Sequence, residues 1–330
     1  MIGVFTRKLG RSNIEISALG MGCWAIGGPF FEKGTPLGWG EVDDGESMRA
    51  IHCALELGIN FFDTANVYGA GHSERVLGKT LAGRRREVVI ATKFNALFDE
   101  AAREVTGSSC APADIRKACE DSLRRLNTDY VDLYQFHDNG YPADQAVPVR
   151  DTLEELVKEG KIRAYGWSTD FADRAEVFAQ GPNCTSIQLQ LNVLDDNPEV
   201  IAICEKHDLA AINRGPLAMG LLTGKYTAST QPSTDDVRGE KSPGWMKYFM
   251  DGKPSPEWLG KMEAVREILT SGGRTLAQGA LAWLWARSEK TIPIPGFRTV
   301  QQVEENCGAL QTGPLAKDQM AEIETILERN

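Results

Sequence analysis

Four residues that can take part in proton transfer each stand at or just beyond the end of a short apolar run. Asp63 and Tyr68 lie in Phe-Phe-Asp-Thr-Ala-Asn-Val-Tyr, Lys93 ends Val-Val-Ile-Ala-Thr-Lys, and His137 ends Tyr-Val-Asp-Leu-Tyr-Gln-Phe-His. Buried parallel strands are apolar runs, and α/β barrels carry their chemistry at the carboxyl ends of the strands. The sequence therefore predicts that a carboxylate, a phenol, an ammonium and an imidazole meet at one site.

These four groups could transfer a proton to or from a carbonyl oxygen. An ammonium beside Tyr68 favours its anion, so Lys93 is expected to lower the pKa of the phenol. Asp63 would keep Lys93 charged, because a lone buried ammonium is costly. His137 could hydrogen-bond a substrate oxygen or relay a proton. None of these side chains can supply a hydride, so the reaction requires a nicotinamide cofactor.

The elements that must position these residues alternate along the chain. Apolar runs predict strands at 18–21, 60–63, 88–93, 130–137, 162–168, 186–191, 210–213 and 291–294. Helical patterns lie between them at 45–57, 73–81, 112–126, 148–159, 171–179, 198–207, 257–269, 275–287 and 299–310. Eight strands that alternate with helices predict an α/β fold, a (β/α)8 TIM barrel, as a single domain over residues 1–330.

The residues beyond a minimal barrel fall at its two ends. Residues 1–17 alternate around Gly10-Arg11-Ser12-Asn13, which predicts a β-hairpin that could cap the bottom of the barrel. Residues 25–43, 96–111 and 216–256 are long, irregular loops after strands one, three and seven, and loops of this length are usually functional.

Composition excludes several classes of protein. The formal net charge of −10 argues against a nucleic-acid partner. No apolar stretch is long enough for a membrane span and no signal peptide is evident, so we expect a cytoplasmic protein without a membrane partner. Seven cysteines without a Cys-x-x-Cys pair suggest reduced thiols, and the four histidines are scattered, so no metal site is expected.

The sequence resembles the aldo-keto reductase superfamily. Within that superfamily it is similar to bacterial members of the branch that also contains the potassium-channel β subunits. The resemblance rests on Gly-Ile-Asn-Phe-Phe-Asp-Thr-Ala-Asn-Val-Tyr-Gly with His-Ser-Glu-Arg-Val-Leu-Gly-Lys, on Val-Ile-Ala-Thr-Lys and on Asp-Leu-Tyr-Gln-Phe-His. It implies a catalytic tetrad of Asp63, Tyr68, Lys93 and His137, with Tyr68 as general acid/base. It also implies NADP(H)-dependent interconversion of a carbonyl (aldehyde, ketone or sugar) and an alcohol.

The resemblance extends to the cofactor. Arg298 follows the eighth strand, where a basic side chain could fork onto an adenosine phosphate, which favours NADP(H) and leaves NAD(H) possible. Ser168 and Gln188 match the family's carboxamide contacts, and the Arg-Gly-Pro-Leu-Ala segment matches its pyrophosphate loop. The implied cofactor-binding residues are Gly22, Cys23, Trp24, Asp63, Ser168, Gln188, Arg214, Gly215, Pro216, Leu217, Ala218, Lys225, Arg238, Gly296, Phe297, Arg298, Gln302, Glu305 and Asn306.

Three residues depart from the family's pattern. Thr169 stands where Asn is commoner, Leu191 where Tyr is frequent, and Arg214 where an aromatic residue often stacks on the nicotinamide. A guanidinium can also stack, but its positive charge would bias the redox state of the ring.

The substrate is expected to be a small carbonyl or alcohol molecule that contacts Trp24, Tyr68, Phe94 and His137. Further aromatic residues are expected over the mouth of the barrel, namely Phe30, Phe31, Trp39, Trp245, Tyr248 and Phe249. A cofactor-binding regulatory or sensor subunit with little turnover is the alternative function. A metal-dependent barrel hydrolase or isomerase lacks the necessary ligand clusters. The sequence leaves the physiological substrate, the direction of reaction and the oligomeric state open.

Overall fold

The predicted apolar runs form the parallel strands of one eight-stranded sheet, ordered β16-β13-β12-β11-β10-β7-β6-β3. The computed structural model describes residues 5–329. Amide hydrogen bonds from Gly20 to the Pro293 carbonyl and from Gly22 to that of Pro295 join the first strand to the last, so the sheet closes into the expected barrel. Its strands are β3 (Met21–Gly22), β6 (Phe61–Asp63), β7 (Val89–Phe94), β10 (Val131–Phe136), β11 (Ile162–Ser168), β12 (Cys184–Gln190), β13 (Ala210–Arg214) and β16 (Thr291–Pro293).

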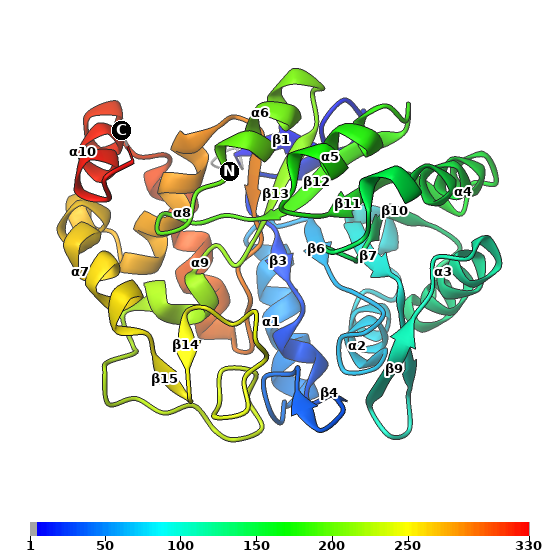
Figure 1. The fold of residues 1–330 in the computed structure, drawn as a ribbon, viewed down its shortest axis with the longest axis horizontal. Coiled ribbons are helices and arrows are strands. Elements are labelled where there is room, and N and C mark those ends of the chain that lie inside the picture. Colours follow the sequence, from blue (N-terminus) through cyan, green and yellow to red (C-terminus); the bar gives the residue numbers. More distant parts are fainter. Residues whose placement is uncertain (1–4, 330) are drawn as a thin grey trace.

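Helices surround this sheet (Figure 1). They are α1 (Asp44–Glu56), α2 (His72–Thr80), α3 (Pro112–Leu126), α4 (Val147–Lys158), α5 (Ala172–Ala179), α6 (Pro198–Lys206), α7 (Pro256–Thr270), α8 (Leu276–Arg287), α9 (Val300–Thr312) and α10 (Lys317–Ile326). Local signals set several of their ends: Asp43 caps α1, Thr275 and Gln278 form a capping box at α8, and Pro112 opens α3. Helix α10 was not predicted.

The alternation of side chains along the strands creates two layers inside the barrel. A lower, apolar layer includes Phe61, Ala91, Leu133 and Ile212, which form one buried cluster. Since successive strand residues point to opposite faces, Asp63, Lys93, Gln135 and Arg214, each two residues further along its strand, also point inward. These residues and their neighbours on the other strands form a polar layer at the carboxyl ends.

The predicted hairpin is present, although residues 1–4 of its expected range lie outside the described residues. Strands β1 (Thr6–Lys8) and β2 (Glu15–Ser17) pair antiparallel. Leu9, Ile14 and Ile16 are buried against the apolar layer of the barrel interior. The hairpin therefore closes the bottom of the barrel, opposite the polar layer.

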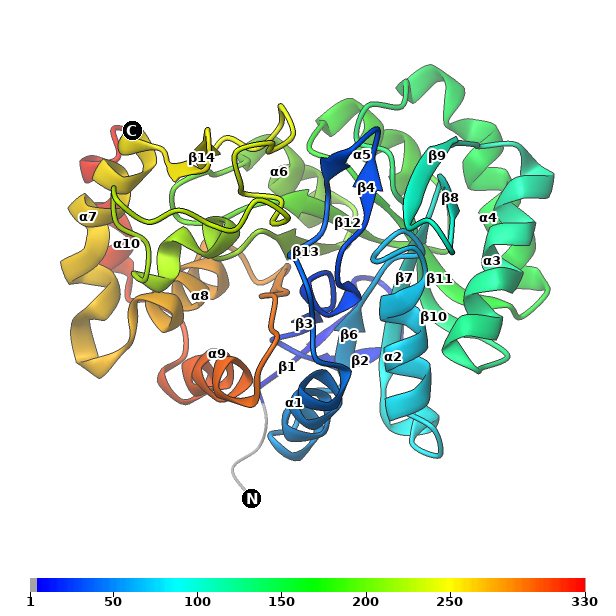
Figure 2. The same ribbon diagram turned by 90° about the horizontal axis from the view of Figure 1, so that it is seen from below.

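The loops at the other end are more ordered than expected. Residues 25–43 contain β4 (Phe31–Glu32) and β5 (Thr35–Pro36), and residues 96–111 contain β8 (Ala96–Asp99) and β9 (Glu104–Ser108). These strands form one small sheet, ordered β5-β4-β9-β8. The third loop, 216–256, carries β14 (Phe249–Met250) and β15 (Lys253–Pro254). Figure 2 shows β4, β8, β9 and β14 along the upper side of the view, with α1 and α9 along the lower side.

Two of these loops touch across the mouth of the barrel. Trp39 and Asp236 form an isolated antiparallel bridge, and the amide of Val237 donates to the carbonyl of Gly38 at 2.7 Å. The bridge connects the loop after the first strand to the loop after the seventh. Within residues 5–329 no helix has the length and apolar character that a membrane crossing requires.

Candidate active site

A buried ion pair lies at the centre of the polar layer. The Nζ atom of Lys93 is 2.5 Å from Oδ1 of Asp63 and 2.8 Å from the carbonyl oxygen of Thr64. Both charged side chains are almost completely buried. The second carboxylate oxygen of Asp63 accepts hydrogen bonds from the amide groups of Gln135 and Gln188, at 2.9 and 2.8 Å. The carboxylate is therefore held from three sides and in turn fixes the ammonium.

Tyr68 reaches this pair from the turn between β6 and α2. Its hydroxyl oxygen lies 3.4 Å from Nζ of Lys93, and its ring stacks on Trp24 with the ring centroids 5.8 Å apart. The turn also packs closely on the segment that follows β3. A Cβ atom at Gly27 would lie 2.8 Å from the carbonyl carbon of Tyr68, so only glycine permits this approach.

His137 stands beside the phenol. It directly follows β10, and its ring meets that of Tyr68 edge to face, with centroids 6.0 Å apart. Burial, together with the positive charges of Lys93 and Arg214, holds the pKa of His137 well below its usual range. The imidazole is therefore neutral near pH 7 and can either accept or donate a hydrogen bond.

The pKa of Tyr68 shifts in the direction opposite to the expected one. Burial of the phenol raises its pKa, and this exceeds the lowering by the charge and hydrogen bond of Lys93. Burial also lowers the pKa of Lys93, but the charges of Asp63 and Tyr68 outweigh it, so that its pKa is raised overall. Lys93 is thus a permanent cation, and Tyr68 is a protonated acid at neutral pH.

The site opens into a cavity of about 1060 Å³ at the mouth of the barrel. Asp63, Tyr68 and His137 line it directly, while Lys93 lies behind them. Most of the expected cofactor residues also line it, namely Gly22, Cys23, Trp24, Ser168, Gln188, Arg214, Gly215, Pro216, Leu217, Lys225, Arg238, Gly296, Phe297, Arg298, Gln302, Glu305 and Asn306. Apart from Lys93, which lies behind the wall, the expected site residues therefore share one space, with two exceptions.

The exceptions are Phe94 and Ala218, and both correct the prediction. Phe94 is the outward neighbour of inward-facing Lys93 on β7. It is fully buried outside the barrel, where its ring stacks on Tyr134 and Phe136 at 4.7 and 5.5 Å. It therefore does not contact a substrate in the cavity. Ala218 is also fully buried and does not line the cavity.

The loop aromatics divide in a similar way. Trp24, Phe30, Trp39, Trp245 and Tyr248 line the cavity. Phe249 is fully buried against Tyr226, with centroids 5.1 Å apart, and Phe31 does not line the cavity either. The indole of Trp24 lies within 5.2 Å of Trp39 and 6.2 Å of Trp245, centroid to centroid, so one wall of the cavity is aromatic.

Three positively charged side chains, Lys225, Arg238 and Arg298, lie together at the end of the cavity near α9. Arg238 is held by Asp236 and lies over the ring of Trp39, 4.4 Å from its centroid. Burial and the charge of Arg238 lower the pKa of Lys225, with Arg298 acting in the same direction and Asp236 in the opposite one. Lys225 forms no ion pair within the described part of the chain. A bound anion would relieve this crowding of cations.

Arg298 also makes contacts that the sequence did not predict. Its guanidinium donates to the backbone carbonyl of Trp39 at 2.9 Å and also to that of Glu41. It therefore ties the loop at 25–43 to the start of α9. The guanidinium has five N–H donors, so others stay available to a phosphate group.

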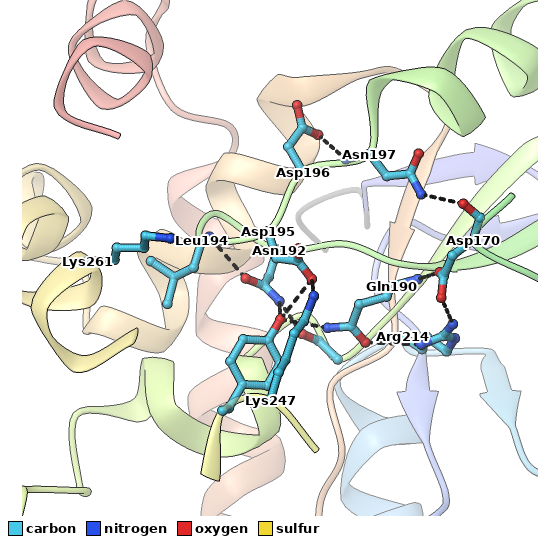
Figure 3. A network of polar contacts seen from close by, with 12 residues as sticks. Asp170, Gln190, Asn192, Leu194, Asp195, Asp196, Asn197, Arg214, Lys247 and Lys261 are labelled. Atoms are coloured by element: carbon cyan, nitrogen blue, oxygen red, sulfur yellow. Dashed lines mark hydrogen bonds and ion pairs between the residues drawn. The ribbon is translucent and has the colours of Figure 1, made fainter. Parts of the chain in front are cut away.

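The other wall of the cavity is a polar network, drawn in Figure 3. Arg214 forms an ion pair with Asp170 and donates to Oε1 of Gln190 at 3.2 Å. The amide of Gln190 donates to the hydroxyl of Tyr248 at 2.9 Å, and Tyr248 donates to Asp195. This network fastens the loop at 216–256 to the ends of β12 and β13.

Two members of the site were missed by the sequence reasoning. Gln135 donates a hydrogen bond to Asp63 and pairs in register with Lys93. A polar amide side chain within a buried, apolar strand was the sequence feature that could have identified it. Asp170, the partner of Arg214, follows β11 in an ordinary loop, and only its position after a strand end could have indicated it. Among the described residues, no group of three or more His, Cys, Asp or Glu side chains is arranged to hold a metal ion.

Comparison with known proteins identifies the family of the chain. Residues 18–328 match the Aldo/keto reductase family. The aldo-keto reductase YhdN of Bacillus subtilis is 32% identical over 334 residues, covering 97% of this chain and 93% of that protein.

Solved structures share the fold. The glycerol dehydrogenase AKR11B4 from Gluconobacter oxydans superimposes with a TM-score of 0.81 at 30% identity, covering 98% of this chain and 95% of that one. An aldo/keto reductase from Klebsiella pneumoniae, in complex with NADP and acetate, has a TM-score of 0.71 at 23% identity, with coverages of 98% and 96%. The chain therefore belongs to the aldo/keto reductase family of oxidoreductases.

Proposed function

We propose that this oxidoreductase interconverts a carbonyl compound and an alcohol with NADP(H), and that Tyr68 is its general acid/base. The observation that supports the proposal is the chain of contacts from Asp63 through Lys93 to the hydroxyl of Tyr68, which ends in the cavity beside His137. A phenol held next to a fixed cation can give up its proton and stabilise the charge that is left.

The residues of the cavity fit the proposed cofactor. Lys225, Arg238 and Arg298 supply positive charge for phosphate groups at the α9 end, and Ser168 and Gln188 are polar residues near the tetrad. The fold of the Klebsiella pneumoniae relative accommodates NADP. When bound, NADPH supplies the hydride that no side chain can provide. Free N–H groups of Arg298 would favour the 2′-phosphate, and hence NADP(H) over NAD(H).

The side chains divide the remaining work. Tyr68 donates a proton to the carbonyl oxygen during reduction and accepts one from the alcohol during oxidation. His137, neutral because of its lowered pKa, hydrogen-bonds the same oxygen and orients it. Lys93 stabilises the phenolate that Tyr68 leaves, and Asp63 holds Lys93 in place. The aromatic wall around Trp24 excludes water from the reacting atoms.

The test combines cofactor titration with turnover. The purified protein is titrated with NADPH and with NADH by tryptophan fluorescence and is then assayed against a panel of aldehydes and ketones. We expect tight NADPH binding, weaker NADH binding and reduction of at least one carbonyl. Tight binding without turnover of any carbonyl would instead favour a cofactor sensor, and no binding of either nucleotide would refute both functions.

The variant Tyr68→Phe tests the assigned acid. It should lower the rate of carbonyl reduction by about 10²–10⁴-fold, the usual contribution of general acid catalysis, because the ring remains but the proton is lost. NADPH affinity, measured by the same fluorescence titration, should stay near that of the wild type. A variant that retains wild-type turnover would remove Tyr68 from the mechanism.

A further inference from the structure

The ion pair between Arg214 and Asp170 stands in the cavity wall beside the catalytic groups. Arg214 ends β13 on its inward-facing side, and both members of the pair line the cavity. Their side chains are partly exposed, at 29% and 26%. Figure 3 shows Arg214, Asp170 and Gln190 pointing toward one another from three successive strand ends. The pair is thus accessible to a ligand in the cavity.

Asp170 is itself held rigidly. Its Oδ1 atom accepts from the backbone amide of Gln190 at 2.7 Å, and its Oδ2 atom accepts from the side-chain amide of Asn139 at 3.0 Å as well as from Arg214. The backbone amide of Asp170 donates in return to Asn139. A carboxylate fixed in this way determines where the guanidinium of Arg214 lies.

Arg214 acts on the reacting centre through its charge. Its positive charge contributes to lowering the pKa of His137 and opposes the burial that raises the pKa of Tyr68. A nicotinamide ring that transfers hydride to a carbonyl bound by Tyr68 would lie beside Tyr68 and His137, the groups on which the charge of Arg214 acts. The ring is neutral in NADPH and positively charged in NADP⁺, so a cation here disfavours NADP⁺ and an anion favours it.

We infer that Asp170 is a positioning and charge-compensating residue for Arg214, and that this pair sets the relative affinity of the site for NADP⁺ and NADPH. The inference rests on the proposed function. With both charges present, their effects on the ring largely cancel. The pair thereby keeps the oxidised and reduced cofactors closer in affinity than a lone arginine would, and so sets how much of the enzyme holds each form at a given cofactor ratio.

The experiment measures dissociation constants for NADP⁺ and NADPH by tryptophan fluorescence, without substrate. Asp170→Asn leaves Arg214 uncompensated and should raise the ratio Kd(NADP⁺)/Kd(NADPH) by roughly tenfold, as one charge does at a partly exposed site. Arg214→Gln leaves Asp170 uncompensated and should lower the same ratio by a similar factor. The double variant Asp170→Asn/Arg214→Gln should return the ratio to within about twofold of the wild type.

Asp196→Asn is a matched control. Asp196 pairs with Arg287 at 3.0 Å and is also partly exposed, but neither residue lines the cavity, so the ratio should not change.

A purely structural role for Asp170 would weaken both nucleotides equally and leave the ratio unaltered, which would overturn the inference. Single variants that shift the ratio in the same direction would overturn it as well. If the wild-type protein binds neither nucleotide, the proposed function itself fails, and the inference fails with it.

Discussion

The protonation states of Tyr68 and His137 follow from burial more than from their charged neighbours. Lys93 does lower the pKa of Tyr68, but desolvation of the phenolate dominates. For His137, burial and the adjacent cations act in the same direction and keep the ring neutral. At the scale of single residues, the site is therefore a protonated phenol beside a neutral imidazole.

This arrangement predicts the pH dependence of carbonyl reduction. A raised pKa keeps Tyr68 protonated as pH rises, and a lowered pKa keeps His137 neutral as pH falls. We expect kcat for reduction to stay constant from about pH 6.5 to about pH 10, the interval between the ordinary pKa values of imidazole and phenol. Oxidation of the alcohol, which requires the phenolate, should instead accelerate with increasing pH over this range. Initial rates in both directions provide the measurement, and an inflection in reduction near neutral pH would contradict the assignment.

The identities of the site residues could be predicted, whereas their surroundings could not. Asp63, Lys93 and His137 stand at strand ends, and the barrel brings such positions together. Phe94 was assigned wrongly because both faces of its strand are apolar, so the inward face could not be recognised. The partnership of Asp170 with Arg214 joins residues 44 positions apart and depends on the stagger of three strands.

At the scale of elements, the two ends of the barrel have separate tasks. The β1–β2 hairpin closes the bottom through apolar contacts, and the loops at the top carry the polar site. Changes in the hairpin should therefore alter stability without altering the site.

Ile16→Ala tests this separation. Ile16 is fully buried under the barrel, so the variant should lose about 2–5 kcal/mol of unfolding free energy, as buried isoleucine truncations do. Urea denaturation gives this value, and Lys8→Ala, on the exposed side of the hairpin, should stay within about 0.5 kcal/mol. NADPH affinity should remain unchanged in both variants. Loss of affinity in Ile16→Ala under native conditions would show that the two ends are coupled.

The barrel strands were predictable to within a few residues because each is an apolar run between turn residues. The small sheet β5-β4-β9-β8 was not. Its strands are short and, apart from Pro36, none of their residues is fully buried, and they carry no regular alternation of apolar and polar residues. Phe31 pairs with Glu104 only because the barrel places their loops side by side, which is a tertiary effect that local pattern does not encode.

At the scale of the whole molecule, the cavity is assembled from segments distant in sequence. Its walls come from the loop at 25–43, the strand ends, the loop at 216–256 and the start of α9. Arg298 connects two of these segments, because it hydrogen-bonds the loop at 25–43 from the start of α9. None of the walls exists in the unfolded chain. A nucleotide that fills the cavity therefore binds only the native state and stabilises it as a whole.

The increase in unfolding free energy that each nucleotide causes should show which cofactor the protein prefers. NADPH at one hundred times its Kd should raise the unfolding free energy by about 2.7 kcal/mol, and NADH at the same concentration should raise it less, because it lacks the 2′-phosphate. Urea denaturation followed by circular dichroism measures both increments. Arg298→Ala should itself lower the unfolding free energy without ligand, because its hydrogen bonds to the carbonyls of Trp39 and Glu41 are lost. The comparison therefore uses only the increase that each nucleotide adds to the free energy of the same variant. The NADPH increment should fall toward that of NADH, which should itself change little. Equal losses for both nucleotides would mean that Arg298 shapes the cavity without contacting the 2′-phosphate.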